Sequence, residues 1–259
     1  MDIKSEFENS NESSPKEFTL DTLTRGVVIG ELHQRENPSE KENERFNKIL
    51  KENKDSIFVL ESDPSDSDLF TEKNSPPTFM SQALEFAKKN NTQVEIMDDE
   101  KIKYNRYEVW KDAGSDLSQR DWDNITAVYI MRVGLNIHNT TFEQIVANVF
   151  NSQVLDESRK QTYLNSFSKY MRILQSEDRD IKLESIDKLV HSYIKYDAIC
   201  RERYYQKKVA NIIENNPDRK IFAVFGKSHT RGISNTIEGS IYPTPLPSIA
   251  KMKWLMGSI

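Results

Sequence analysis

Four short segments with the β-branched or aromatic residues of buried strands stand out along the chain, and all but the third are nearly continuous apolar runs. They span residues 26–29, 57–60, 93–97 and 220–225. Two segments with helical spacing of apolar residues separate the first three runs. One follows Ser39, a candidate N-cap, and the other covers residues 78–89. Each apolar run ends in polar residues, so the pattern predicts strands that alternate with helices.

Strands alternating with helices predict a parallel sheet with right-handed crossovers. A long helical stretch follows the third strand, from about 119 to 215, with segments near 122–136, 141–151, 155–175 and 179–215. We therefore expect an α/β fold with a mostly parallel central sheet, crossover helices and a large helical insertion before the last core strand. A single α/β domain over 18–259 is expected, with the insertion at about 119–215. Residues 1–17 are polar and have little to bury, which predicts a disordered N-terminal tail.

Composition narrows the class of partner. The net charge is −5, with 30% charged residues, so no electrostatic argument favours nucleic acid as the main partner. A basic run at 201–208 could suggest RNA contact, but such a run is more typical of the solvated face of a helix. We expect a substrate that is a small molecule or a peptide, and the oligomeric state stays open.

The sequence contains few features that would indicate export or membrane insertion. Cys200 is the only cysteine, so an intrachain disulfide is impossible. The N-terminal segment lacks the apolar core of a secretion signal, and no apolar run approaches the roughly 18 residues of a membrane span. A soluble, cytoplasmic protein is the default expectation. Export as an effector or toxin without a cleaved signal is compatible with the same features.

Polar residues follow every predicted strand. His33 follows the first, Glu61 the second, Asp98 and Asp99 the third, and His229 the last. In a parallel sheet all strand C-termini lie along one edge, where ligands bind. Residues about 200 positions apart are thus expected to meet there, and Asp98 and Asp99 are the weaker candidates because paired acids after a strand often form a solvated turn.

Two of the four histidines share a Gly-x-x-His pattern, Gly30–His33 and Gly226–His229. With 8 glycines in 259 residues, chance produces such a pair in roughly half a percent of cases. A glycine after a buried strand lets the chain turn sharply or approach a ligand closely. The first turn also contains Glu31, a second candidate carboxylate beside Glu61.

These motifs resemble a superfamily that joins Tiki and TraB proteins, erythromycin esterases and ChaN-type haem-binding proteins. Its pattern is a strand with Gly-x-x-His, a Glu after the next strand, an Arg-bearing helix and a second Gly-x-x-His. The similarity covers roughly residues 24–100 and 195–240. Arg201 takes the place of the helix arginine, with Arg203 as the alternative, because Glu202 and Tyr205 depart from the usual family sequence.

The resemblance to Tiki proteins implies metal-dependent peptide-bond hydrolysis. In this version His33, His229 and a carboxylate, Glu61 or Glu31, bind a divalent ion such as Mn, Co or Zn, with positions left open for water. The ion lowers the pKa of that water, a neighbouring carboxylate accepts the proton, and Arg201 stabilises the oxyanion.

The resemblance to erythromycin esterases implies hydrolysis of an ester or lactone without a metal. One histidine, oriented by Glu61 or Glu31, then takes a proton from water directly. The resemblance to ChaN-type proteins implies binding of haem or another ligand, with a histidine as the axial ligand. A third alternative is a non-catalytic effector or interaction module on the same fold.

Overall fold

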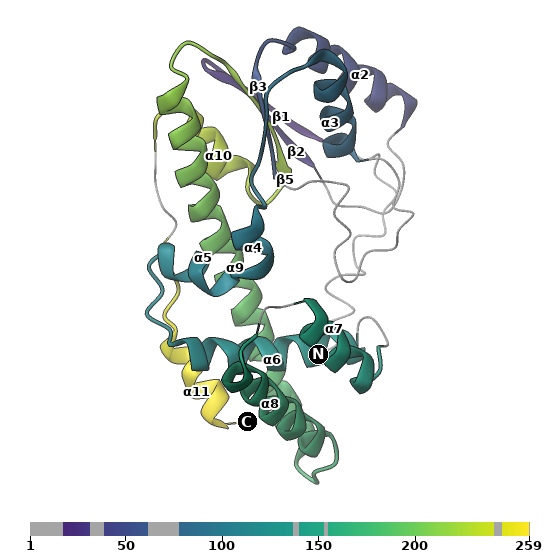
Figure 1. The fold of residues 1–259 in the computed structure, drawn as a ribbon, viewed down its shortest axis with the longest axis vertical. Helices are drawn as coiled ribbons and strands as arrows, with labels where there is room; N and C mark the ends of the chain where they lie inside the picture. Colours follow the sequence, from purple (N-terminus) through teal and green to yellow (C-terminus); the bar gives the residue numbers. More distant parts are fainter. Residues whose placement is uncertain are drawn as a thin grey trace. The chain divides into compact units, whose positions relative to one another are not determined.

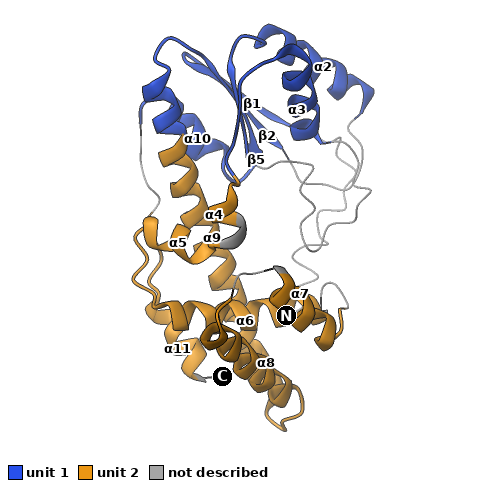
Figure 2. Ribbon diagram, viewed as in Figure 1, with its two compact units in different colours: residues 1–66, 72–97, 209–240 blue, residues 67–71, 98–208, 241–259 orange. Residues whose placement is uncertain are grey.

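The computed structural model describes residues 18–31, 39–61, 78–136, 140–152, 155–240 and 245–258 (Figure 1). The predicted tail at 1–17 and His33 lie outside these ranges. The chain divides into two compact units (Figure 2). The first comprises residues 1–66, 72–97 and 209–240, and the second comprises residues 67–71, 98–208 and 241–259. Each unit is built around its own hydrophobic core.

The first unit contains the sheet, and its four predicted strands are confirmed. The strands are β1 (Thr19–Leu23), β2 (Gly26–Glu31), β3 (Ile57–Leu60), β4 (Val94–Ile96) and β5 (Ile221–Gly226). Their order is β1-β2-β5-β3-β4, and all neighbours are parallel except β1 and β2. The antiparallel β1 was not predicted, because Thr-Leu-Asp-Thr-Leu is a partly exposed edge strand without the apolar run of a central one.

Two crossover helices cover one face of this sheet, and α10 (Thr230–Ile237) lies on the other (Figure 1). Helix α2 (Glu40–Glu52) begins after Ser39 in a capping box with Glu42, as its sequence predicts. Helix α3 (Phe79–Asn90) begins after Thr78, whose hydroxyl accepts from the Ser81 amide. The core between these helices and the sheet is rich in phenylalanine.

The second unit is helical and forms the expected insertion before the last strand. Its helices are α4 (Glu100–Tyr104), α5 (Arg106–Asp112), α6 (Gln119–Asn136), α7 (Phe142–Ser152), α8 (Glu157–Leu174), the greater part of α9 (Arg179–Asn215) and α11 (Ala250–Ser258). Helical structure therefore begins at α4, before the predicted start at residue 119. Helices α4 and α5 were not predicted because they are too short to give a clear periodicity. None of the helices in the described part of the chain is long and apolar enough to cross a membrane.

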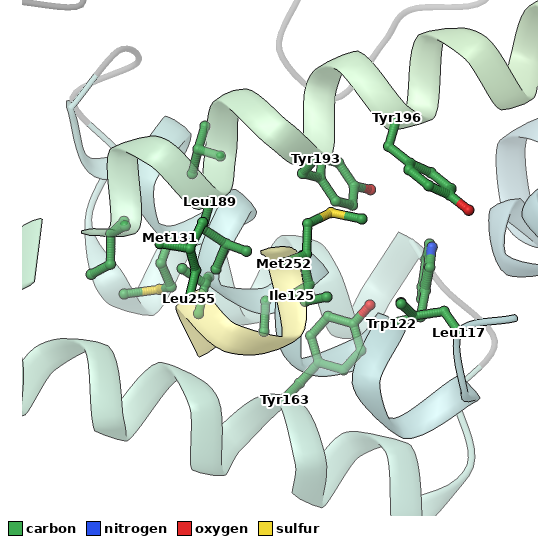
Figure 3. Close-up of a cluster of buried hydrophobic side chains, with 14 of the residues drawn as sticks. Leu117, Trp122, Ile125, Met131, Tyr163, Leu189, Tyr193, Tyr196, Met252 and Leu255 are labelled. Carbon is green, nitrogen blue, oxygen red and sulfur yellow. The ribbon is translucent and has the colours of Figure 1, made fainter. Parts of the chain in front are cut away.

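The core of the helical unit combines aliphatic residues with several large aromatic ones (Figure 3). Trp122 from α6, Tyr163 from α8 and Tyr193 from α9 are buried there. Helix α11 follows a Pro-rich segment and was not predicted from the sequence. Its Met252 and Leu255 are buried in the same cluster, so packing against the insertion stabilises this short helix.

Partly buried ion pairs tie the long helices of this unit together. Arg159 of α8 contacts the buried carboxylate of Asp123 on α6 at 3.0 Å. Arg132 of α6 makes two hydrogen bonds, of 2.6 and 2.9 Å, to Asp187 of α9. A two-point arginine–carboxylate contact fixes direction as well as distance, so these pairs set how the helices are aligned.

One glycine of the first motif has a packing role. Gly30 lies within β2, not after it as the sequence suggested, and pairs with Thr19 of β1. A Cβ at Gly30 would lie 2.1 Å from Thr19 Oγ1 and 2.6 Å from Thr230 Cγ2. The close neighbours of this glycine are thus side chains of β1 and α10.

We therefore expect Gly30→Ala to lower the free energy of unfolding by about 1–3 kcal/mol, because two side chains must move. Adding Thr19→Ala should recover part of the loss, since it removes the nearest atom. Gly257→Ala in α11 is the control, because nothing lies within 4 Å of its new Cβ. Urea unfolding measures all three variants. Equal stability of Gly30→Ala and wild type would contradict the packing role.

Candidate functional site

At the carboxyl edge of the sheet, the ends of β2 and β3 both lie beside the end of β5. Strand β5 lies between β2 and β3, with Glu31 opposite Gly226 and Leu60 opposite Val224. The Lys227 amide donates to the Glu31 carbonyl at 2.9 Å. Glu61 follows β3 directly, and its amide donates to the Val224 carbonyl at 3.0 Å. The ladder thus continues past the strand ends and fixes the backbone from which the polar side chains project.

The second Gly-x-x-His motif forms a closed turn. The His229 amide donates to the Gly226 carbonyl at 2.9 Å, which is the hydrogen bond of a β-turn. His229 is also the N-cap residue of α10, and its carbonyl accepts from Ile233. Lys227 and Ser228 in the middle of the turn are exposed, whereas His229 is buried. The turn therefore directs the imidazole inward and the lysine into solvent.

Glu61 and His229 form a buried pair. Each residue is 5% exposed, and Glu61 Oε1 lies 3.8 Å from His229 Nε2. The other carboxylate oxygen, Oε2, accepts a hydrogen bond of 2.5 Å from the Gly226 amide. A buried carboxylate is stable only where donors or opposite charge compensate for lost water. Here the β5 backbone supplies a donor and holds the carboxylate beside the imidazole.

Glu31, the other predicted carboxylate, faces a different partner. It is also 5% exposed, and its two oxygens accept from the amides of Phe79 at 3.1 Å and Met80 at 3.2 Å. These are the first two residues of α3, whose amides have no partner within the helix. Glu31 therefore anchors the N-terminus of α3 at the end of β2, where the helix dipole also favours a negative charge.

Arg201 belongs to the second unit, where it contacts Asp98 and Tyr205. Its Nε and Nη2 donate to the Tyr205 hydroxyl at 2.9 and 2.6 Å, and Nη2 lies 3.4 Å from an Asp98 oxygen. The Tyr205 hydroxyl in turn donates to Asp98. Arg203 donates to the Ala113 carbonyl at 2.6 Å. Arg201, the arginine predicted first, is therefore in contact with a predicted carboxylate.

Asp99 is held by the same stretch of α9. It accepts from the Tyr204 hydroxyl at 2.7 Å and from Lys208 Nζ at 2.9 Å, and it caps α4 through the Lys101 and Ile102 amides. Burial raises the pKa of Asp99, but the hydrogen bonds from Lys208, Tyr204 and Ile102 outweigh burial and hold that pKa below its ordinary value. Neither aspartate is thus a solvated turn residue.

The structure therefore places the predicted site residues in two groups. Glu61 and His229 lie together in the first unit, with Glu31 at the end of the next strand but one. Arg201 and Asp98 lie together in the second unit. Sequence reasoning missed Tyr204 and Tyr205 as partners of the aspartates. Their spacing of four residues from Lys208 and Arg201 is the signal that could have found them.

Among the described residues, no group of three His, Cys, Asp or Glu side chains is arranged to hold a metal ion. The predicted metal site comprises His33, His229 and Glu61, and His33 lies outside those residues.

Comparison with known proteins gave no family assignment. No family model matches the sequence, and neither the curated proteins nor the solved structures yield a significant match.

The position of Glu31 predicts a stability effect. We expect Glu31→Gln to lower the free energy of unfolding by about 1–3 kcal/mol, because the amide NH2 of glutamine must face a backbone N–H at the start of α3. Glu40→Gln is the matched control, since Glu40 is an exposed acid in the first turn of α2. Urea unfolding compares the two. Losses of equal size in both variants would contradict the anchoring role.

The depressed pKa of Asp99 predicts a pH dependence. The folded state gains stability from the Asp99 charge above the unfolded pKa of about 4 and loses this gain as pH falls through the lower folded value. The stability of wild type relative to Asp99→Asn should therefore be greatest near neutral pH and should shrink towards about pH 2–3. Asparagine keeps the N-cap of α4. A difference that stays constant in urea titrations across this range would disagree with the assignment.

Proposed function

We propose that this protein is a hydrolase whose acid–base centre is the Glu61–His229 pair, acting on a peptide, ester or lactone bond. The observation that carries the proposal is the 3.8 Å approach of a buried carboxylate to a buried imidazole at the carboxyl edge of a parallel sheet. The resemblance of the two Gly-x-x-His motifs to those of the Tiki, esterase and ChaN superfamily supports the same class of reaction.

The pair divides the chemistry between two side chains. His229 takes the proton from an attacking water, and the imidazolium that forms is stabilised by the negative charge of Glu61. Since the Gly226 amide holds Glu61 Oε2, the other oxygen stays directed at the ring. A separation of 3.8 Å exceeds a hydrogen bond, and such contacts commonly shorten when substrate binds.

The same two donors suit a divalent metal. Nitrogen and oxygen ligands at about 2.0–2.2 Å from a tetrahedral ion lie about 3.3–3.6 Å from one another, close to the separation of Glu61 Oε1 and His229 Nε2. These residues, with His33 as the third ligand, would hold Mn, Co or Zn. A bound ion would lower the pKa of its water and polarise the scissile carbonyl.

The proposed centre does not include Glu31 or Arg201. The Glu31 carboxylate binds the first amides of α3, so we assign it a positioning role and give the partnership with the imidazole to Glu61. Arg201 lies in the second unit, where Asp98 and Tyr205 hold its guanidinium. Its role as an oxyanion donor stays a prediction from the family resemblance.

Activity assays on three bond classes test the centre. Suitable probes are p-nitrophenyl acetate for esters, dihydrocoumarin for lactones and fluorescein-labelled casein for peptides. We expect hydrolysis of at least one probe, and a loss of about 10²–10⁴-fold in His229→Ala and in Glu61→Gln, because each removes part of the proton-transfer pair. His191→Ala, an exposed histidine on α9, is the control and should keep full activity. Normal turnover by the two site variants would refute the proposal.

Metal analysis separates the two versions of the mechanism. Stoichiometric metal in the wild type, lost in His229→Ala together with chelator-sensitive activity, supports the metal-dependent version. Full activity in chelator without stoichiometric metal supports direct proton transfer to His229.

A further inference from the structure

Two of the points at which the chain passes between the units are the ends of the helical insertion. The chain leaves the first unit after Met97 and returns after Lys208. Met97 is fully buried, and its amide donates to the Leu60 carbonyl at 2.8 Å. At the return point α9 continues without a break, and Val209 is fully buried. Each end of the insertion is therefore covalently joined to a buried residue of the first unit.

The two ends of the insertion bind each other. Asp98 and Asp99 are its first two residues, and their partners lie in its last two helical turns, on α9. The partners form two tyrosine–cation pairs with a spacing of four residues, Arg201–Tyr205 and Tyr204–Lys208. The first pair holds Asp98 and the second holds Asp99. We call these six residues the end clamp.

The end clamp is well suited to hold its charges. Tyr205 is fully buried, and the side chains of Asp98 and Arg201 are 16% and 22% exposed. Partial burial reduces the solvent screening that makes surface ion pairs weak, more at Asp98 than at Asp99, whose side chain is 37% exposed. Burial and the hydrogen bond to Asp99 raise the pKa of Tyr204, so its hydroxyl stays a donor.

Neighbouring charges on α4 and α5 support this arrangement. Arg106 on α5 interacts electrostatically with both Asp98 and Arg201, and it contacts Asp197 at 3.6 Å. Asp112 on α5 adds negative charge near Tyr204 and is itself paired with Lys101 of α4. Arg106 therefore adds a positive charge near Asp98, whereas the negative charge of Asp112 helps to keep the Tyr204 hydroxyl protonated.

The end clamp joins the two ends of the insertion, and this location determines how its loss would affect unfolding. An insertion of about 110 residues can unfold while its ends remain attached to a folded sheet, because the entropy of loop closure grows only slowly with length. With the clamp intact, unfolding of the insertion must break contacts made by the residues bonded to Met97 and Val209. Disturbance at the ends then reaches Met97, the residue that follows β4, and the last turns of α9.

We propose that the end clamp couples the unfolding of the helical insertion to that of the sheet, so that the chain melts in a single transition. The inference is independent of the Glu61–His229 pair, since neither of these two residues belongs to the end clamp. It assigns Asp98, Asp99 and the two tyrosine–cation pairs a conformational role.

The chain offers a selective probe for this test. All 10 Tyr and 3 Trp residues lie at positions that belong to the second unit. Intrinsic fluorescence therefore reports on the helical unit alone, whereas calorimetry reports on both units. Coincidence of transitions seen by different probes is the standard test of a single cooperative unit.

The experiment compares full-length wild type with Asp98→Asn/Asp99→Asn and with the milder Tyr204→Phe/Tyr205→Phe, which removes only two hydroxyls. We expect one calorimetric peak in the wild type at the fluorescence midpoint. Both clamp variants should show two peaks separated by about 5 °C or more, with fluorescence following the lower one.

Asp187→Asn is the matched control. It breaks the two-point contact with Arg132 inside the same unit but far from both ends of the insertion. It should therefore lower the midpoint temperature of a single transition that calorimetry and fluorescence still report together. A wild type that already shows two transitions, clamp variants that keep one coincident transition, or a split in Asp187→Asn would each overturn the proposal.

Discussion

The parallel pairing of β5 with both β2 and β3 is the constraint on which the rest of the structure depends. No hydrogen bonds join β2 and β3 directly, since β5 lies between them and supplies the ladder on both sides. The buried side chains of these strands form the hydrophobic core of the first unit only when the three strands are paired in this register. Because β5 also ends in Gly226, the same alignment sets the amide that binds Glu61 and the turn that carries His229.

Acidic residues at or just after the ends of three strands have different physical roles in this fold. The buried Glu31 binds helix amides, the buried Glu61 lies beside an imidazole, and Asp98 and Asp99 bind tyrosines and cations of α9. The two glutamates are buried, where a negative charge needs a specific donor or cation to remain, whereas the side chains of Asp98 and Asp99 are only partly buried. An acidic residue at the end of a strand is therefore a candidate for a specific interaction, and the identity of its partner determines its structural or chemical role.

Much of the first unit could be predicted because its signals are local. Buried strands are short apolar runs, the cap at Ser39 marks where α2 begins, and the helical spacing of apolar residues over 78–89 predicts α3. The meeting of Glu61 and His229 followed from topology alone. The partners of Glu31 could not be predicted, because they are backbone amides and any sequence provides those. Strand β1 and helix α11 were missed because packing against other elements, not their own periodicity, stabilises them.

The place of β5 in the sequence has a consequence for synthesis. The central strand is the last to be made, about 160 residues after β3 ends. At roughly 5–20 residues per second, the ribosome needs about 8–32 s to translate that interval. Throughout this time the edges of β2 and β3 that β5 will join have no native partner, and unpaired strand edges are templates for aggregation. The nascent chain is therefore expected to depend on chaperones that shield these strands until β5 emerges.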